Sequence, residues 1–186
     1  MKQKIIRAHM QVSETYAQCS TAKRLKVGAI LVKDDRIISI GYNGMPSGWD
    51  NSCENIEWMG DAGGWLSPEE IEAQWPFEGI YMDKDGEEYV SRYRLVTKPE
   101  VLHAEANAIA KVARSSESAE GSTLFVTHAP CMECAKLIYQ SGIDKVYYRN
   151  YYRSNAGLEF LKQAGITVNQ LEDDNDPDQH RTATGS

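Results

Sequence analysis

The sequence has no long apolar run. No stretch approaches the roughly 20 apolar residues that a membrane-spanning helix needs. The first ten residues mix Lys2, Lys4 and Arg7 with apolar side chains and form no continuous apolar segment. We therefore expect no signal peptide and no membrane partner. With neither feature expected, we predict a soluble cytoplasmic protein, and 186 residues are enough to bury a core without disulfide staples.

Cysteine is scarce as well. The four cysteines are Cys19, Cys53, Cys131 and Cys134. Without a secretory signal, so few cysteines do not indicate a disulfide framework. The pair Cys131 and Cys134 is instead typical of a metal or redox site in a reducing compartment.

Positive charge is in deficit too, because the formal net charge is −7. Residues 44–100 carry −9 and residues 172–186 carry −4, which leaves +6 on the rest of the chain. A protein that binds long nucleic acids usually presents a broad basic face, so we expect no nucleic-acid partner. The mildly basic remainder suits a small anionic substrate, although ordinary solvated charges explain it equally well.

Helical and strand patterns alternate along most of the chain, which predicts an α/β sandwich around one sheet. Two of the predicted strands flank a turn at Asp34-Asp35. The predicted helices are 3–18, 103–114, 130–140 and 156–164, and the predicted strands are 27–32, 36–42, 122–127, 144–148 and 166–169.

The segment 44–100 interrupts this alternation and is rich in glycine, proline and acidic residues. It also holds all four tryptophans: Trp49, Trp58, Trp65 and Trp75. Disordered linkers are poor in aromatics, so we expect a folded insertion whose tryptophans pack, or else form a lid or a subunit contact. We predict one catalytic domain over 1–171 containing this insertion, followed by an acidic disordered tail over 172–186.

Two short motifs carry the chemistry: His103-Ala104-Glu105 and Pro130-Cys131-Met132-Glu133-Cys134. Residues three apart share a helix face, so Cys131 and Cys134 can chelate one ion. A nearby helix N-terminus favours their thiolates. With His103 as a third ligand, a tetrahedral zinc keeps its fourth position for water, which is the catalytic arrangement. Glu105 is two residues from His103, so it faces elsewhere and is predicted to move protons.

These residues also allow a structural zinc site or a redox pair. A structural zinc needs four protein ligands, and Cys19 and Cys53 are isolated in the sequence. His128 lies near Cys131 and is a possible fourth ligand. A redox pair would not need His103 and Glu105.

Together the motifs have the pattern H-x-E…P-C-x-x-C of zinc deaminases, and the chain resembles the cytidine deaminase superfamily, in particular the deoxycytidylate (dCMP) deaminases. The segments that carry the resemblance are 27–29 (VGA), 41–44 (GYNG), 103–109 (HAEANAI) and 130–136 (PCMECAK). The resemblance implies a three-layer α/β/α fold with a five-stranded mixed sheet. It implies zinc held by His103, Cys131 and Cys134, with Glu105 as proton shuttle.

The resemblance also implies substrate contacts. Asn43 matches the asparagine that meets the sugar, and the Ala104 backbone N–H would hold the cytosine carbonyl. For the 5′-phosphate we choose Lys23, Arg24 and Arg114 from the available cations, because charge-assisted bonds hold phosphate. Arg114 matches an arginine of some dCMP deaminases.

Regulation and assembly follow from the same resemblance. The family is typically activated by dCTP and inhibited by dTTP, each with Mg²⁺, at a site that would include Tyr42, Asn43 and Gly44. Members are commonly homohexamers. Some relatives carry a second zinc, but residues 44–102 contain Cys53 and no histidine, so we do not expect one here.

The leading hypothesis is thus hydrolysis of dCMP to dUMP and ammonia. The alternatives are a tRNA adenosine deaminase, another cytidine or pyrimidine deaminase, and a non-catalytic regulatory protein that binds nucleotides. The acidic composition opposes the first of these, and the intact motif opposes the last.

Overall fold

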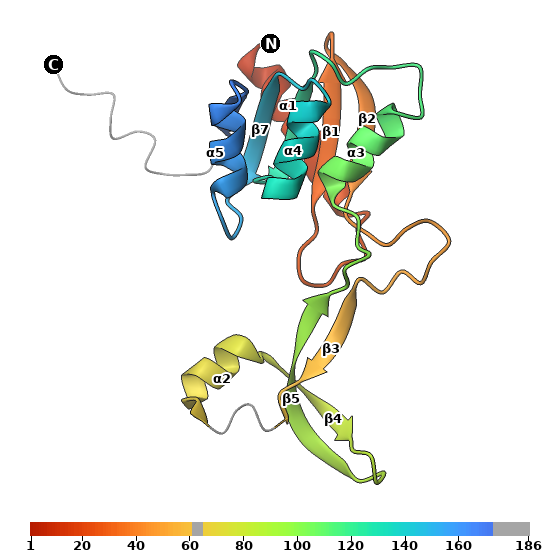
Figure 1. Cartoon of the computed structure of the whole chain (residues 1–186), viewed down its shortest axis with the longest axis vertical. Helices are drawn as coiled ribbons and strands as arrows, with labels where there is room; N and C mark the ends of the chain where they lie inside the picture. Colours follow the sequence, from red (N-terminus) through yellow and green to blue (C-terminus); the bar gives the residue numbers. More distant parts are fainter. Residues whose placement is uncertain (61–64, 173–186) are drawn as a thin grey trace, which may run out of the picture. The chain divides into compact units, whose positions relative to one another are not determined.

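The computed structural model describes residues 1–60 and 65–172, so nearly all of the predicted acidic tail lies outside the described residues. The chain divides into two compact units. The first is built from residues 1–21 and 26–44 and from the chain after residue 101, and the second from residues 22–25 and 45–101 (Figure 1). The second unit coincides closely with the predicted insertion. Among the described residues, no helix has the length and apolar character to cross a membrane.

The first unit contains a mixed five-stranded sheet, which confirms the predicted fold class. Its strands are β1 (Gly28–Lys33), β2 (Arg36–Tyr42), β6 (Thr123–His128), β7 (Lys145–Asn150) and β8 (Thr167–Gln170). Their order is β2-β1-β6-β7-β8. β1 is antiparallel to both β2 and β6, whereas β6, β7 and β8 run parallel.

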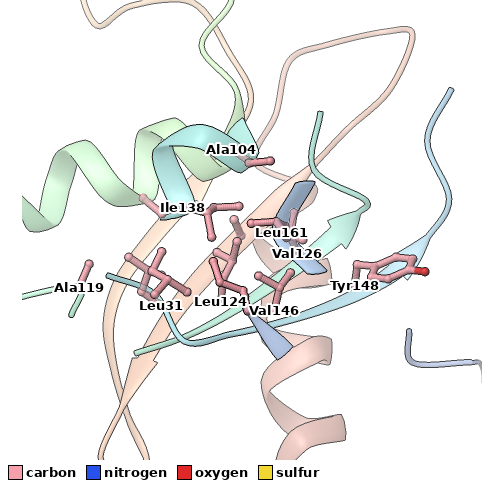
Figure 2. Packing of buried hydrophobic residues seen from close by; sticks show 14 of the residues in the cluster. Leu31, Ala104, Ala119, Leu124, Val126, Ile138, Val146, Tyr148 and Leu161 are labelled. Carbon is pink, nitrogen blue, oxygen red and sulfur yellow. The ribbon is translucent and has the colours of Figure 1, made fainter. Parts of the chain in front are cut away.

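Helices cover both faces of this sheet. Successive residues of a strand point to opposite sides, so neighbouring residues of β1 pack against different helices. On β1, Leu31 packs in the cluster that includes residues of α3 (Ala104–Val112), α4 (Met132–Gln140) and α5 (Ala156–Gln163). Its neighbour Ile30 packs in the cluster with α1 (Gln3–Ala17). Figure 2 shows the first cluster, with Leu31, Leu124 and Val146 packed together. The three layers are therefore α1, the sheet, and α3 with α4 and α5.

Two predicted helix starts were wrong by one or two residues. α3 begins at Ala104 and leaves His103 as its N-cap, and α4 begins at Met132 and leaves Cys131 as its N-cap. Both cap residues have extended backbones, as N-cap residues usually do. The propensity pattern does not separate the cap from the first turn, although the two differ in backbone conformation.

The second unit has a three-stranded antiparallel sheet of its own, in the order β3-β5-β4. The strands are β3 (Glu54–Trp58), β4 (Phe77–Met82) and β5 (Glu88–Thr97). Trp58 and Tyr93 contact across β3 and β5, with ring centroids 5.1 Å apart. The helix α2 (Pro68–Gln74) starts with a capping box between Ser67 and Glu70. Trp75, just after α2, is buried beneath Arg94, whereas Trp49 and Trp65 are exposed.

Candidate metal centre and active site

The start of α3 presents the first half of the site. His103 caps the helix, and Ala104 and Ala108 are fully buried in the main core, which fixes this end of the helix against the sheet. Figure 2 shows Ala104 at the edge of this core. The alanines matter because larger side chains would hold the helix farther from the strands. His103 is therefore held on a rigid element.

The start of α4 presents the second half. Cys131 is the N-cap and Cys134 lies in the first turn, so the two thiols come from one helix end rather than one helix face. The Nδ1 atom of His103 lies 3.5 Å from Sγ of Cys131 and 3.3 Å from Sγ of Cys134. Their ligand atoms all lie within 4.8 Å of one another, and across the described parts of the chain no other such group of three occurs.

These distances fit a zinc ion. Tetrahedral ligands at ordinary zinc–nitrogen and zinc–sulfur bond lengths lie about 3.5 Å apart for nitrogen and sulfur. The two measured separations, 3.3 and 3.5 Å, agree with that requirement without rearrangement. One imidazole and two thiols are also donors that zinc prefers. The three protein donors leave one tetrahedral position for water or substrate.

The three side chains are hydrogen-bonded to one another, and this shifts their pKa values in different directions. Hydrogen bonds from Cys134 and then from His103 lower the pKa of Cys131 to about 3. The pKa of Cys134 is raised, because its thiol donates to Cys131 and is buried. The hydrogen bond to Cys131 raises the pKa of His103. The hydrogen bonds thus favour the thiolate form of Cys131, and metal binding would require His103 and Cys134 to be deprotonated as well.

Glu105 lies in the first turn of α3, next to the donors but not among them. Only 4% of it is exposed. Burial raises the pKa of its carboxyl to about 7, against the opposing effects of its own backbone N–H and of His103. A carboxyl with a pKa near neutrality can both accept and donate a proton, which is what a shuttle requires.

The other candidate ligands have different surroundings. Nδ1 of His128 lies 3.2 Å from the hydroxyl of Thr127, and His128 is not part of the donor group. Cys53 is fully buried in an apolar cluster with Ala22 and Val101, and Cys19 is exposed. His128 therefore does not complete a structural zinc site.

Two of the predicted substrate residues, Asn43 and Ala104, lie at the same end of the sheet as the donors. Asn43 follows β2, and its side-chain oxygen accepts the Val27 N–H at 2.8 Å. Ala104 is the first residue of α3, where backbone N–H groups lack partners within the helix. Gly44 exchanges two backbone hydrogen bonds with Leu102, the residue before His103. These contacts place both segments near the metal ligands, while their roles stay predictions.

Asn107 belongs to the segment 103–109, where the sequence indicates no role for it, and the structure supplies one. Its side-chain N–H donates to the carbonyl of Tyr42 at 2.8 Å and so ties α3 to the end of β2. Lys111, one turn further along α3, lies 5.5 Å from the Tyr42 ring. A polar residue on the sheet-facing side of an alanine-rich helix is the signal that could have identified this contact.

The predicted phosphate ligands belong to different units of the chain. Arg114 follows the far end of α3, nine residues from Glu105, or about 13 Å along a helix axis. Lys23 and Arg24 belong to the second unit, where their backbone N–H groups donate to Glu54. The Arg24 guanidinium donates to Thr97. The phosphate assignment therefore stays a prediction.

The fold and the donor set together define a class. A three-layer α/β/α domain with a His-Cys-Cys group at two helix starts and a buried glutamate beside it is a zinc-dependent deaminase domain. The family model of the cytidine and deoxycytidylate deaminase zinc-binding region matches residues 3–150. The chain belongs to this family.

Relatives from several sources agree with this assignment. The deoxycytidylate deaminase of Enterobacteria phage T4 is 37% identical over 169 residues, covering 86% of each chain. The ComE operon protein 2 of Bacillus subtilis is 33% identical and covers 88% of this chain and 69% of its own. The crystal structure of dCMP deaminase from cyanophage S-TIM5 in complex with dCMP and dUMP is 41% identical, with a TM-score of 0.70 over 92% of this chain and 99% of that one.

Proposed function

We propose that this protein hydrolyses dCMP to dUMP and ammonia with zinc as its cofactor. The observation that carries the proposal is the approach of His103 to Cys131 and Cys134 within 3.5 Å, with the buried Glu105 beside them. The substrate follows from the relatives, since the phage T4 protein is a deoxycytidylate deaminase and the cyanophage enzyme was determined with dCMP and dUMP.

The chemistry is divided between the metal and the protein. A zinc ion held by His103, Cys131 and Cys134 would supply a water with a pKa lowered to about 7. Glu105 would take a proton from that water onto its carboxylate, pass it to N3 of the cytosine ring, and later help to protonate the departing amine. The Ala104 N–H, at the positive end of α3, holds the ring carbonyl. Water adds its oxygen at C4, the C4–N bond breaks, and the products are dUMP and ammonia.

The test is ammonia release from dCMP, compared with CMP, cytidine, dCTP and a tRNA that carries the target adenosine. We expect preferential release from dCMP. Preferential release from another of these compounds would be consistent with the zinc chemistry but would refute dCMP as the substrate. No release from any of them by zinc-loaded protein would overturn the enzymatic proposal.

Regulation belongs to the same proposal. We place an effector site for dCTP–Mg²⁺ (activating) and dTTP–Mg²⁺ (inhibiting) at Tyr42, Asn43 and Gly44. The support is that Gly44 is bonded through both backbone groups to Leu102, which directly precedes His103. A displacement of this segment therefore acts on a metal ligand. Saturation curves for dCMP should shift in opposite directions with the two effectors. Curves that are the same with and without the effectors would refute the effector site.

We also propose that the protein is a homohexamer and that it is located in the cytoplasm. We propose further that Lys23, Arg24 and Arg114 contact the phosphate of the substrate. The location is supported by the two thiol ligands, which need a reducing compartment. Sedimentation of the zinc-loaded protein at several concentrations tests the assembly, and a single monomeric species throughout would refute it. Charge reversal of each cation tests the phosphate contacts, and an unchanged KM for dCMP in all three variants would refute them.

A further inference from the structure

We propose that two glycines that are not themselves metal ligands, Gly41 on β2 and Gly157 on α5, are positioning residues that set the separation of the metal ligands. Each allows another element to touch the backbone at the start of a ligand-bearing helix. The proposal rests on the proposed zinc site, but not on the identity of the substrate.

Gly157 supports the cysteine half of the site. It is buried at the second position of α5. A Cβ built on it would lie 2.1 Å from the carbonyl oxygen of Pro130 and 2.9 Å from the carbonyl carbon and oxygen of Cys131. These are backbone atoms of the ligand segment, so no side-chain rotation can relieve the contact. Alanine is otherwise the preferred residue in a helix, and its absence here has a steric reason.

Gly41 supports the histidine half in the same way. A Cβ on this residue would lie 2.1 Å from the carbonyl oxygen of Ala104 and 2.7 Å from the backbone nitrogen of Ala108. Ala104 stands between His103 and Glu105, so whatever moves its carbonyl moves a ligand and the shuttle together. A glycine inside a strand often marks such a close approach of another backbone.

The displacement exceeds what a metal site tolerates. Cβ atoms do not approach other heavy atoms within 3.0 Å, so the added Cβ and the carbonyl oxygen at 2.1 Å have to separate by about 0.9 Å. Functional constellations need their groups within about 0.5 Å of the productive geometry. A methyl group at either glycine shifts one half of the donor set and leaves the other half in place. His103 then separates from the two thiols.

Gly28 offers a matched control. A Cβ on this residue of β1 would lie 2.0 Å from the carbonyl oxygen of Ser13 and 2.5 Å from the nitrogen of Ala17. The steric conflict is as severe, but it falls on α1, which carries no ligand. Gly28→Ala therefore reports the cost of the clash to the fold alone.

The experiment compares Gly157→Ala, Gly41→Ala and Gly28→Ala with the wild type in the full chain. Co²⁺ is titrated into metal-free protein, and its visible absorption reports both affinity and ligand geometry. Circular dichroism of the metal-free proteins reports folding. We expect Gly157→Ala and Gly41→Ala to remain folded, to weaken Co²⁺ binding by about 10–100-fold and to change the spectrum. Gly28→Ala should keep the wild-type affinity and spectrum.

Wild-type Co²⁺ affinity and spectrum in both Gly157→Ala and Gly41→Ala would overturn the proposal. Failure of these variants to fold without metal, with Gly28→Ala folded, would also overturn it, because the glycines would then serve the fold rather than the metal centre. Wild-type protein that binds Co²⁺ but does not deaminate dCMP would refute the proposed substrate. The role of the two glycines would still be decided by the Co²⁺ affinities and spectra of the variants.

Discussion

Replacing Glu105 by glutamine removes the proposed proton shuttle while keeping the shape of the side chain. Glu105 is 4% exposed, so solvent has little access to take over its role. Positioned general acid–base catalysis contributes about 10²–10⁴-fold to rate, or about 2.7–5.5 kcal/mol of activation free energy. Because one carboxyl handles several proton transfers here, we expect the loss in kcat to lie at the upper end of that range.

Zinc content should not change in the same variant, because Glu105 is not one of the three donors. The assay is ammonia release from saturating dCMP, paired with the zinc-to-protein ratio of the purified protein. Glu133→Gln is the control. Its carboxylate lies between the two ligand cysteines in the sequence, yet its side chain is 79% exposed and pairs with Lys136 at 2.7 Å. Turnover within tenfold of wild type in Glu105→Gln, or loss of its zinc, would refute the reasoning.

Four further predictions concern the metal, the core, a turn and pH. Cys134→Ala should abolish zinc binding and turnover together, as measured by metal analysis and ammonia release; an active, zinc-loaded variant would exclude this ligand. Phe125→Ala should lower the free energy of unfolding by about 3–5 kcal/mol in urea titration, because the ring is fully buried and stacks on Tyr147. Asp35→Gly should raise it by about 0.5 kcal/mol, since Asp35 has a φ of 57° in a two-residue hairpin turn that favours glycine; an unchanged or lower melting temperature would contradict this. Burial lowers the pKa of His9, so the unfolded state binds more protons and stability falls as the pH drops below about 6.5; His9→Gln should weaken that dependence in urea titrations carried out above and below that pH.

The catalytic residues could be found in the sequence because their pattern is local. Cys131 and Cys134 are three residues apart, and Glu105 is two from His103, so each half of the site is visible within one short segment. The alternation of helices and strands likewise predicts an α/β sandwich. Helix starts were less certain, because His103 and Cys131 look helical in the sequence and are N-caps in the structure.

The surroundings of the predicted substrate and effector residues could not be predicted from the sequence. Asn43 and Gly44 were chosen by resemblance, and neither the hydrogen bond to Val27 nor the bridge to Leu102 has a sequence signal. Arg114 was chosen because it ends the predicted catalytic helix, 103–114, and matches an arginine of some dCMP deaminases. The length of α3 carries it away from Glu105, which its charge alone does not indicate.

By itself, then, the sequence determined the donor types, the shuttle and the class of fold, since these depend on residue identity and on spacing within a turn or two. Only the tertiary structure decided that His103 lies within 3.5 Å of thiols 28 and 31 residues away. It also decided the strand order, the separate sheet of the second unit, and the contacts of Gly41 and Gly157 with the ligand segments. Such contacts join residues far apart in the chain, and their distances are set by the packing of whole helices on a sheet.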